Sequence, residues 1–363
     1  EQLTGESEQE LLALLYGVGG RGYDYLGQYQ KAIKWNKDAL DIRKRILGET
    51  HYMTAVSYNN LASAYQAAGN YTKALDLYKF ALKNFCKELG PDHATVASAY
   101  SNIAGIYDCQ GEFDRALEYY QKALDIRLEI YGEKHSETAV IYNNIAYVYA
   151  RKAHYWEALE NHAKVLEIRK AEVGEKHVLT ATSYSNIAYI YTCLGDFTKA
   201  LEMQYMALDI REVVLGVNHP ETLATYMNIA FIRSETGNYD EALKIYNNII
   251  PIYENTRGQH HLDTAAAYCN IAGTYYTIGD YLTALKYYNL ALNIRKQVLG
   301  TDHPDTATLY GNIAAVYADQ GSYDMALEKY EDALAIQKEM KIRLSNCIRK
   351  RWISGKRFWE RST

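Results

Sequence analysis

The sequence predicts an all-α protein, a solenoid of about eight antiparallel helix pairs, and three observations carry that prediction. A repeat of 42 residues runs through seven units without insertion or deletion. Each unit holds two segments whose apolar residues recur at helical spacing, and a small residue, usually glycine, separates them. Only four prolines occur among 363 residues, which favours long helices.

Three residue types mark the repeat most clearly. Each unit carries a histidine, a glycine three residues before it and an asparagine nine residues after it. The histidines are His51, His93, His135, His177, His219, His261 and His303; the asparagines are Asn60, Asn102, Asn144, Asn186, Asn228, Asn270 and Asn312. Self-similarity at a fixed period is typical of repeat proteins whose stacked units share one core.

The unit at 94–132 shows how one repeat is built. Its first helix is expected at roughly 94–110, and Gly111 ends it. Its second helix is expected at roughly 113–131. Tyrosines and alanines recur at fixed positions in both helices, so large side chains meet small ones and the helices pack closely.

The two ends of the array depart from this pattern. An atypical N-terminal repeat covers 8–48, where Gly17, Gly19, Gly20 and Gly22 are expected to weaken the first helix. Seven regular repeats cover 52–342, so the predicted solenoid domain spans 1–342. A basic C-terminal extension follows at 343–363. We expect 341–352 to extend the last helix as a cap, with a disordered end; docking on nucleic acid, a membrane or an acidic partner is the alternative.

Three internal positions also break the pattern. Ala153 replaces the glycine between the helices of repeat four, Arg233 replaces a tyrosine in repeat six, and Pro251 falls inside a second helix. The proline is expected to kink that helix. Tolerated drift is the favoured interpretation, and a local bend or partner surface near 233–258 is the alternative.

The ordered series of aromatic, Leu/Ile–Ala, aromatic, Gly, aromatic and Ala resembles the tetratricopeptide repeat family. The 42-residue period, "NNLA" (59–62), "NNIA" (143–146) and "LGxxHP[DE]T" (215–222, 299–306) resemble the kinesin light chain subclass in particular. The resemblance covers about 11–342. It implies a right-handed superhelix whose first helices line a concave inner surface, and a protein-binding rather than enzymatic role.

The resemblance also implies six inward positions per unit, at 13, 10, 9, 6, 3 and 2 residues before the residue between the helices. The asparagine series occupies the third. The fourth holds Tyr147, Tyr189 and Phe231 in mid-array with small residues on either side, which predicts a central apolar patch with roomier flanks. The candidate peptide-binding residues are the seven asparagines together with Asn143, Tyr147, Tyr189, Phe231, Arg151 and Tyr276.

The asparagine series has two interpretations. An amide offers a donor and an acceptor, so it can pair with the backbone of an extended peptide of any sequence. Alternatively, each asparagine bonds a neighbouring repeat and has a structural role. The basic residues of a chaperone carboxylate clamp are absent, because the relevant positions hold Val56, Ser98, Val140, Thr182, Ala224, Ala266 and Thr308. We therefore expect a neutral, aromatic or mildly basic peptide segment rather than an acidic one.

Other function classes are disfavoured. Five cysteines without CxxC spacing argue against disulfides and zinc and fit a cytoplasmic setting. The repeated histidines stand singly and are expected to cap the next helix, so we expect no metal, no cofactor and no enzyme activity. A net charge of −5 argues against general nucleic-acid or membrane binding. The function predicted is a peptide-binding scaffold; the alternative is the sensor or autoinhibitory array of a longer protein.

Overall fold

The computed structural model describes residues 5–338 and is all-α over that range, without a strand. The chain divides into two compact units, Glu1–Leu194 and Gly195–Thr363. The first contains α1 (Gly5–Tyr25), α2 (Tyr29–Leu47), α3 (Tyr52–Ala67), α4 (Tyr71–Leu89), α5 (Ala94–Cys109), α6 (Phe113–Tyr131), α7 (Ser136–Arg151), α8 (Tyr155–Val173) and α9 (Val178–Cys193). The second contains α10 (Phe197–Leu215), α11 (Pro220–Glu235), α12 (Tyr239–Thr256), α13 (Leu262–Thr277), α14 (Tyr281–Leu299), α15 (Pro304–Asp319) and a further helix over 323–338.

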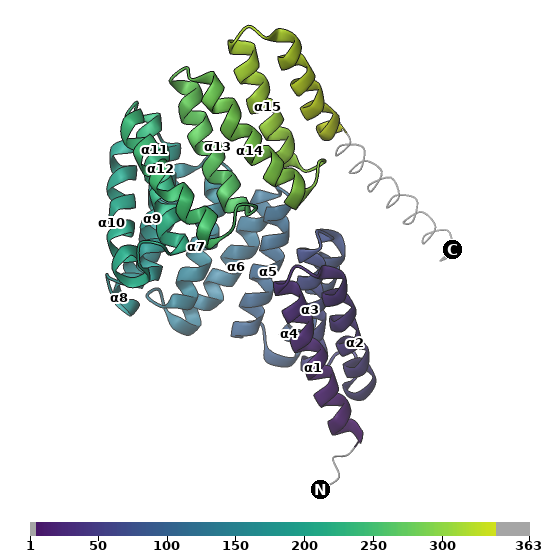
Figure 1. The fold of residues 1–363 in the computed structure, drawn as a ribbon. Coiled ribbons are helices and arrows are strands. Elements are labelled where there is room, and N and C mark those ends of the chain that lie inside the picture. Colours follow the sequence, from purple (N-terminus) through teal and green to yellow (C-terminus); the bar gives the residue numbers. More distant parts are fainter. Residues whose placement is uncertain (1–4, 339–363) are drawn as a thin grey trace. The chain divides into compact units, whose positions relative to one another are not determined.

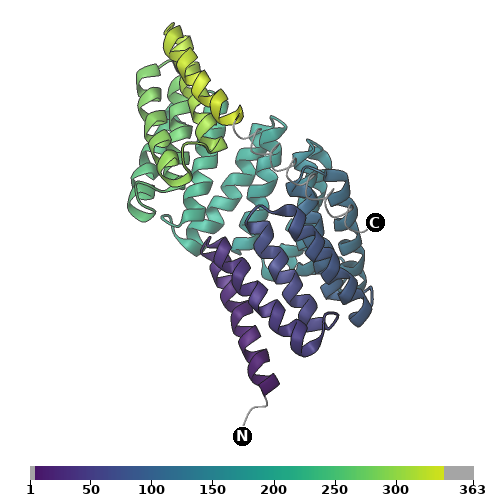
Figure 2. The same ribbon diagram turned by 90° about the vertical axis from the view of Figure 1, so that its right-hand side faces the viewer.

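Within each unit, every helix packs against the next one along the chain (Figures 1 and 2). The predicted all-α architecture of helix pairs is confirmed. The helix bounds in repeat three, at 94–131, agree with the expected ones within one residue. The expected cap over 341–352 lies outside the described residues.

Each repeat is joined to the next by the same short loop, and the repeated histidine ends it. His93 Nδ1 accepts a hydrogen bond from the Thr95 amide at 3.1 Å, and all seven histidines of the series cap a first helix in this way. Thr54 Oγ1 donates to the Gly48 carbonyl at 2.8 Å, and Thr138, Thr180, Thr264 and Thr306 repeat this bond. The expectation that these histidines cap helices is therefore confirmed.

Arginines on the second helices join neighbouring repeats, a role the sequence analysis missed. Arg43 is buried and donates to Ser57 Oγ at 3.0 Å and to the Met53 carbonyl at 3.4 Å. The same repeat position holds Arg127, Arg169, Arg211 and Arg295, and each contacts the residue ten positions further on. A buried guanidinium needs such partners, so these bonds fix the second helix against the following first helix.

The glycines of α1 do not interrupt the helix. The helix continues from Gly5 to Tyr25 through all of them. A Cβ at Gly19 would lie 2.3 Å from the Trp35 ring, and one at Gly20 would lie 2.5 Å from Asn36 Nδ2. These glycines let α2 approach closely, and that packing outweighs their low helix propensity.

Repeat six departs from the repeat pattern at Pro251 and Arg233, and its helices accommodate both residues. Helix α12 runs continuously through Pro251 and ends at Thr256. Arg233 donates to Tyr205 Oη at 3.2 Å and pairs with Glu241 at 3.1 Å, so its charge is satisfied within the second unit. The structure thus assigns Arg233 ordinary polar partners.

Ala153 occupies the turn of repeat four with φ of 59°, a left-handed conformation that glycine adopts at the equivalent turns. Its turn keeps the usual bonds, since Ala153 and His154 donate to the carbonyls of Ala150 and Tyr149 at 2.9 Å. The alanine therefore bears a conformational cost that the fold imposes.

We predict that Ala153→Gly raises the free energy of unfolding by about 1 kcal/mol, because glycine adopts positive φ without strain. Urea denaturation of the intact chain measures this change. The matched control, Ala150→Gly in the last turn of α7, should lower stability by about 1 kcal/mol. Equal destabilisation by both variants would contradict the prediction.

Candidate functional site

The predicted inward positions of adjacent repeats touch one another. Asn102 Nδ2 donates to Asn59 Oδ1 at 3.1 Å, and Asn186 Nδ2 donates to Asn143 Oδ1 at 3.2 Å. Both bonds join residues 43 apart, the second inward position of one repeat and the third of the next. The first helices of the first unit therefore present these amides on one shared face.

These bonds separate the members of the asparagine series. For Asn102 and Asn186 the intramolecular role is directly visible, and each keeps one N–H and its carbonyl oxygen for another partner. Asn60 and Asn144 are half-buried and make no side-chain hydrogen bond within residues 5–338. In the second unit, Asn270 is half-buried while Asn228 and Asn312 are exposed.

Arg151, the one basic residue expected on this face, is paired internally. Its Nη1 lies 2.7 Å from Asp108 Oδ1 and donates to the Asp108 carbonyl at 3.0 Å. Its guanidinium also lies 5.0 Å from the centre of the Phe113 ring. The cation is therefore neutralised by the preceding repeat and points to no acidic ligand.

A similar contact occurs in the second unit. Tyr276 Oη donates to Asp319 Oδ2 at 2.5 Å, again across 43 residues. Because this bond stabilises the protonated phenol, it raises the pKa of Tyr276 to about 12. Tyr276 is thus held by the following repeat, and the Asp319 carboxylate on this face accepts a hydrogen bond from it.

The three aromatic residues at the fourth inward position remain exposed. Tyr147 is 42% exposed, Tyr189 58% and Phe231 40%. Tyr147 and Tyr189 belong to the first unit and Phe231 to the second. The Cys193 thiol beside Tyr189 raises the pKa of that phenol through a hydrogen bond. Aromatic rings left in solvent at one repeated position are typical of a contact surface.

The fourth position is supported from behind by the second helix. A Cβ at Gly105 would lie 3.7 Å from Tyr120 Oη, and one at Gly273 would lie 3.5 Å from Tyr288 Oη. Where the inward residue is Tyr147, the residue behind it is His162, and the two rings meet edge to face at 5.4 Å. At Gly105 and Gly273, the space on the inward face therefore has a tyrosine hydroxyl of the second helix behind it.

His162 is buried beneath this aromatic residue, with 1% of its surface exposed. Burial, with a smaller contribution from the positive charge of Arg169, lowers the pKa of His162 to about 4. The imidazole is therefore neutral near pH 7. It has a packing role behind Tyr147.

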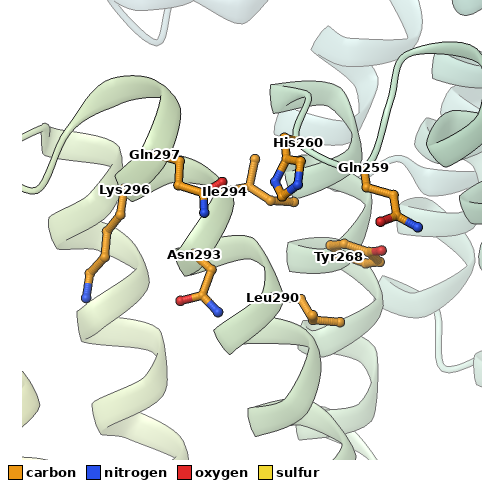
Figure 3. Close-up of a pocket in the computed structure, with 8 residues that line it drawn as sticks. All are labelled: Gln259, His260, Tyr268, Leu290, Asn293, Ile294, Lys296 and Gln297. Carbon is orange, nitrogen blue, oxygen red and sulfur yellow. The ribbon is translucent and has the colours of Figure 1, made fainter.

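One hollow lies away from the inward positions, in the second unit. It has a volume of about 550 Å³ and is lined by Gln259, His260, Tyr268, Leu290, Asn293, Ile294, Lys296 and Gln297. Figure 3 shows it between the loop before α13 and the last turns of α14. The histidine doublet is divided here, because His260 lines the hollow and His261 caps α13.

Within residues 5–338, no three His, Cys, Asp or Glu side chains are grouped closely enough to hold a metal ion. None of the helices in this range is both long and apolar enough to cross a membrane. The four cysteines described, Cys86, Cys109, Cys193 and Cys269, are free thiols.

Comparison with known proteins identifies the repeat. A family model described as Tetratricopeptide repeat matches residues 12–87, 55–129, 95–171, 179–255, 221–297 and 263–339. A search of curated proteins finds no match.

Three solved structures show the same fold. A putative kinesin light chain from Podosopora anserina is 22% identical over 56% of this chain and 96% of its own, with a TM-score of 0.50. A Rap protein complexed with Competence and Sporulation Factor is 19% identical over 94% and 89%, with a TM-score of 0.60. The quorum sensor NprR from B. thuringiensis is 17% identical over 90% and 88%, with a TM-score of 0.68.

We predict that His162→Gln removes a pH-dependent part of the stability. The folded pKa of His162, about 4, lies below the ordinary value of 6.5, so the unfolded chain binds the proton more readily. The wild type should lose stability relative to the variant as pH falls from 6.5 to 4, at no more than about 1.4 kcal/mol per pH unit. Urea unfolding of both proteins across this range measures the difference; a difference that stays constant with pH contradicts the prediction.

Proposed function

We propose that this chain, which belongs to the tetratricopeptide repeat family, is a non-enzymatic scaffold that binds an extended peptide segment of a partner protein. The peptide would lie along the first helices of the first unit, where inward asparagines and aromatic residues are. The observation that carries the proposal is the exposure of Tyr147 and Tyr189 at one repeated position of that unit.

The aromatic residues would supply most of the binding free energy. Tyrosine rings have large contact areas and few rotatable bonds, so ordering them costs little entropy. In the first unit, Tyr147 rests on His162, which limits its movement before a ligand arrives. A ring fixed in this way is a suitable anchor for an apolar or aromatic ligand side chain.

The asparagines would hold the ligand backbone. Asn60 and Asn144 have both amide groups available, and Asn102 and Asn186 have one N–H and an oxygen each. Each hydrogen bond to a peptide contributes about 1 kcal/mol net. Because Asn59 and Asn143 already orient the side chains of Asn102 and Asn186, the series of inward asparagines is partly ordered before a peptide binds.

Charge restricts the ligand to a neutral, aromatic or mildly basic segment. The Arg151 cation is paired with Asp108, and the basic residues of a carboxylate clamp are absent from this face. An acidic peptide would find no unpaired cation at the inward positions.

The free thiols Cys86, Cys109, Cys193 and Cys269 support a reducing compartment such as the cytoplasm.

The solved neighbours support the proposal through their fold. The Rap protein, whose fold is similar over most of both chains, was solved with Competence and Sporulation Factor bound, and NprR is a quorum sensor. A helical repeat array of this length can therefore accommodate a specific ligand.

We predict that Tyr189→Ala weakens the binding of selected peptides by about tenfold or more, the usual effect of losing an aromatic anchor. Asn144→Ala and Asn186→Ala should each weaken it by about fivefold through loss of a backbone contact. Isothermal titration with peptides selected from a displayed random library on the wild-type chain measures these effects. The control is Asn161→Ala, a half-buried asparagine on the second helix α8, outside the inward positions. If all folded variants bind as the wild type does, the proposed site is wrong.

We also predict that selected peptides are poor in Asp and Glu, and that Asp108→Asn changes this preference. The substitution leaves Arg151 without its carboxylate partner, so the variant should select acidic peptides that bind more weakly at high salt. Sequencing the pools selected by both proteins tests the idea. A wild-type pool dominated by acidic residues would refute the charge argument.

A further inference from the structure

The second helices of the first unit change their charge along the array. Apart from the buried Arg43 and Arg127, α2 and α4 contain five and four Lys and Arg against two Asp and Glu each. Helices α6 and α8 contain two and three Lys and Arg against four Asp and Glu each. The outer surface that these helices form is therefore basic at α2 and α4 and acidic at α6 and α8. A surface with this order of charge is complementary to a second copy of itself in reversed order.

The sign of the charge changes at equivalent positions of α4 and α6. Lys83 is the one basic residue at its repeat position, where α6 has Asp125. Four residues further on, α4 has Lys87 and α6 has Glu129. All four side chains are exposed, and none of them makes an ion pair within residues 5–338. Asp125 accepts a hydrogen bond from the uncharged Gln121 at 2.7 Å. These four charges are therefore open to a partner.

A two-fold axis that runs along α4 and α6 and passes between them would bring opposite charges together. Both helices pack on α5 and belong to the same unit, so their outer faces point the same way. A copy rotated by 180° about this axis has its α6 opposite α4 and its α4 opposite α6, with equivalent repeat positions at the same height. Lys83 would then face Asp125 of the second copy, and Lys87 would face Glu129. The symmetry forms each of these pairs twice.

The other residues of this face limit the contact to the C-terminal halves of α4 and α6. Cys86 and Leu128, which are half-buried, share one equivalent position between the charged pairs and would add apolar contact. Asp76 and Glu118 share an equivalent position nearer the N-terminal ends, and their like charges oppose close contact there. A contact of this size, held mainly by exposed ion pairs, is weak and sensitive to salt.

We propose that this face joins two copies of the chain into a symmetric dimer, with α4 of each copy against α6 of the other. A second copy is the occupant because the carboxylates that match Lys83 and Lys87 lie in the same chain, at the same repeat positions. A nucleic acid or an anionic membrane would be repelled by Asp76, Asp125 and Glu129 on the same face. Since second helices form the contact, the dimer leaves the inward positions of the first helices open and does not depend on the proposed peptide site.

Sedimentation equilibrium of the intact chain at about 0.05 M and about 0.5 M salt tests the proposal. The wild type should show a monomer–dimer equilibrium whose dissociation constant is about tenfold higher at the higher salt concentration, because screening weakens exposed ion pairs. The double variants Lys83→Glu with Lys87→Glu and Asp125→Lys with Glu129→Lys place like charges opposite one another. Each should weaken its own dimer by about tenfold or more. An equimolar mixture of the two variants should form a heterodimer about as readily as the wild type dimerises, since every facing pair again has opposite signs.

The matched control is Lys244→Glu with Lys286→Glu, which makes the same change of charge at exposed residues of α12 and α14 in the second unit. This variant should dimerise as the wild type does. A wild type that stays monomeric at low salt and about 0.5 mM chain would overturn the proposal. So would a dimer that all variants form equally, or charge-reversed variants that fail to associate when mixed. Because the substituted side chains are exposed, circular dichroism should show the same helix content in every variant.

Discussion

The structure depends on one junction, which recurs between successive 42-residue repeats. A glycine with positive φ ends the second helix, and a histidine caps the next first helix two residues before the amide that it accepts. In five junctions a threonine also bonds back to that glycine carbonyl, as Thr138 does to Gly132 at 2.8 Å. Each helix end thereby satisfies groups that would otherwise be orphaned. Because the junctions share one geometry, neighbouring repeats within a unit meet in the same way, and equal positions fall on equal faces.

Contacts across repeats follow from that regularity. Pairs 43 residues apart meet on the inward face, as Asn59 with Asn102 and Asp108 with Arg151 do. Contacts ten residues apart tie a second helix to the following first helix, as for Arg43 and Met53. A single inserted residue would disrupt the contacts 43 residues apart and those ten residues apart at the same time. This gives a physical reason why the seven repeats contain no insertion or deletion. The surface that could hold a ligand is therefore a consequence of the loops.

The sequence predicted what periodicity determines and missed what depends on close contact. Helix pairs, their bounds and the capping histidines follow from spacing and local chemistry. The glycines of α1 resemble helix breakers in sequence, and only the contacts of Gly19 with the Trp35 ring and of Gly20 with Asn36 show why two of them are small. For the asparagine series, spacing placed all members on one face. It could not show that Asn102 is bonded to Asn59 while Asn60 makes no such bond, because the difference depends on the residue 43 positions earlier, which is Asn59 for Asn102 and Gly17 for Asn60.

The fourth inward position shows how one regular frame supports different surfaces. Behind Gly105 and Gly273 the second helix supplies a tyrosine, whereas behind Tyr147 it supplies the smaller His162. In these three repeats a small inward residue stands before a large one and a large inward residue before a smaller one, so the space between the helices stays filled. Moving the ring to the solvent side leaves the core intact and exposes an aromatic face. The array can therefore change what it offers a partner, repeat by repeat, without altering the junctions that align it.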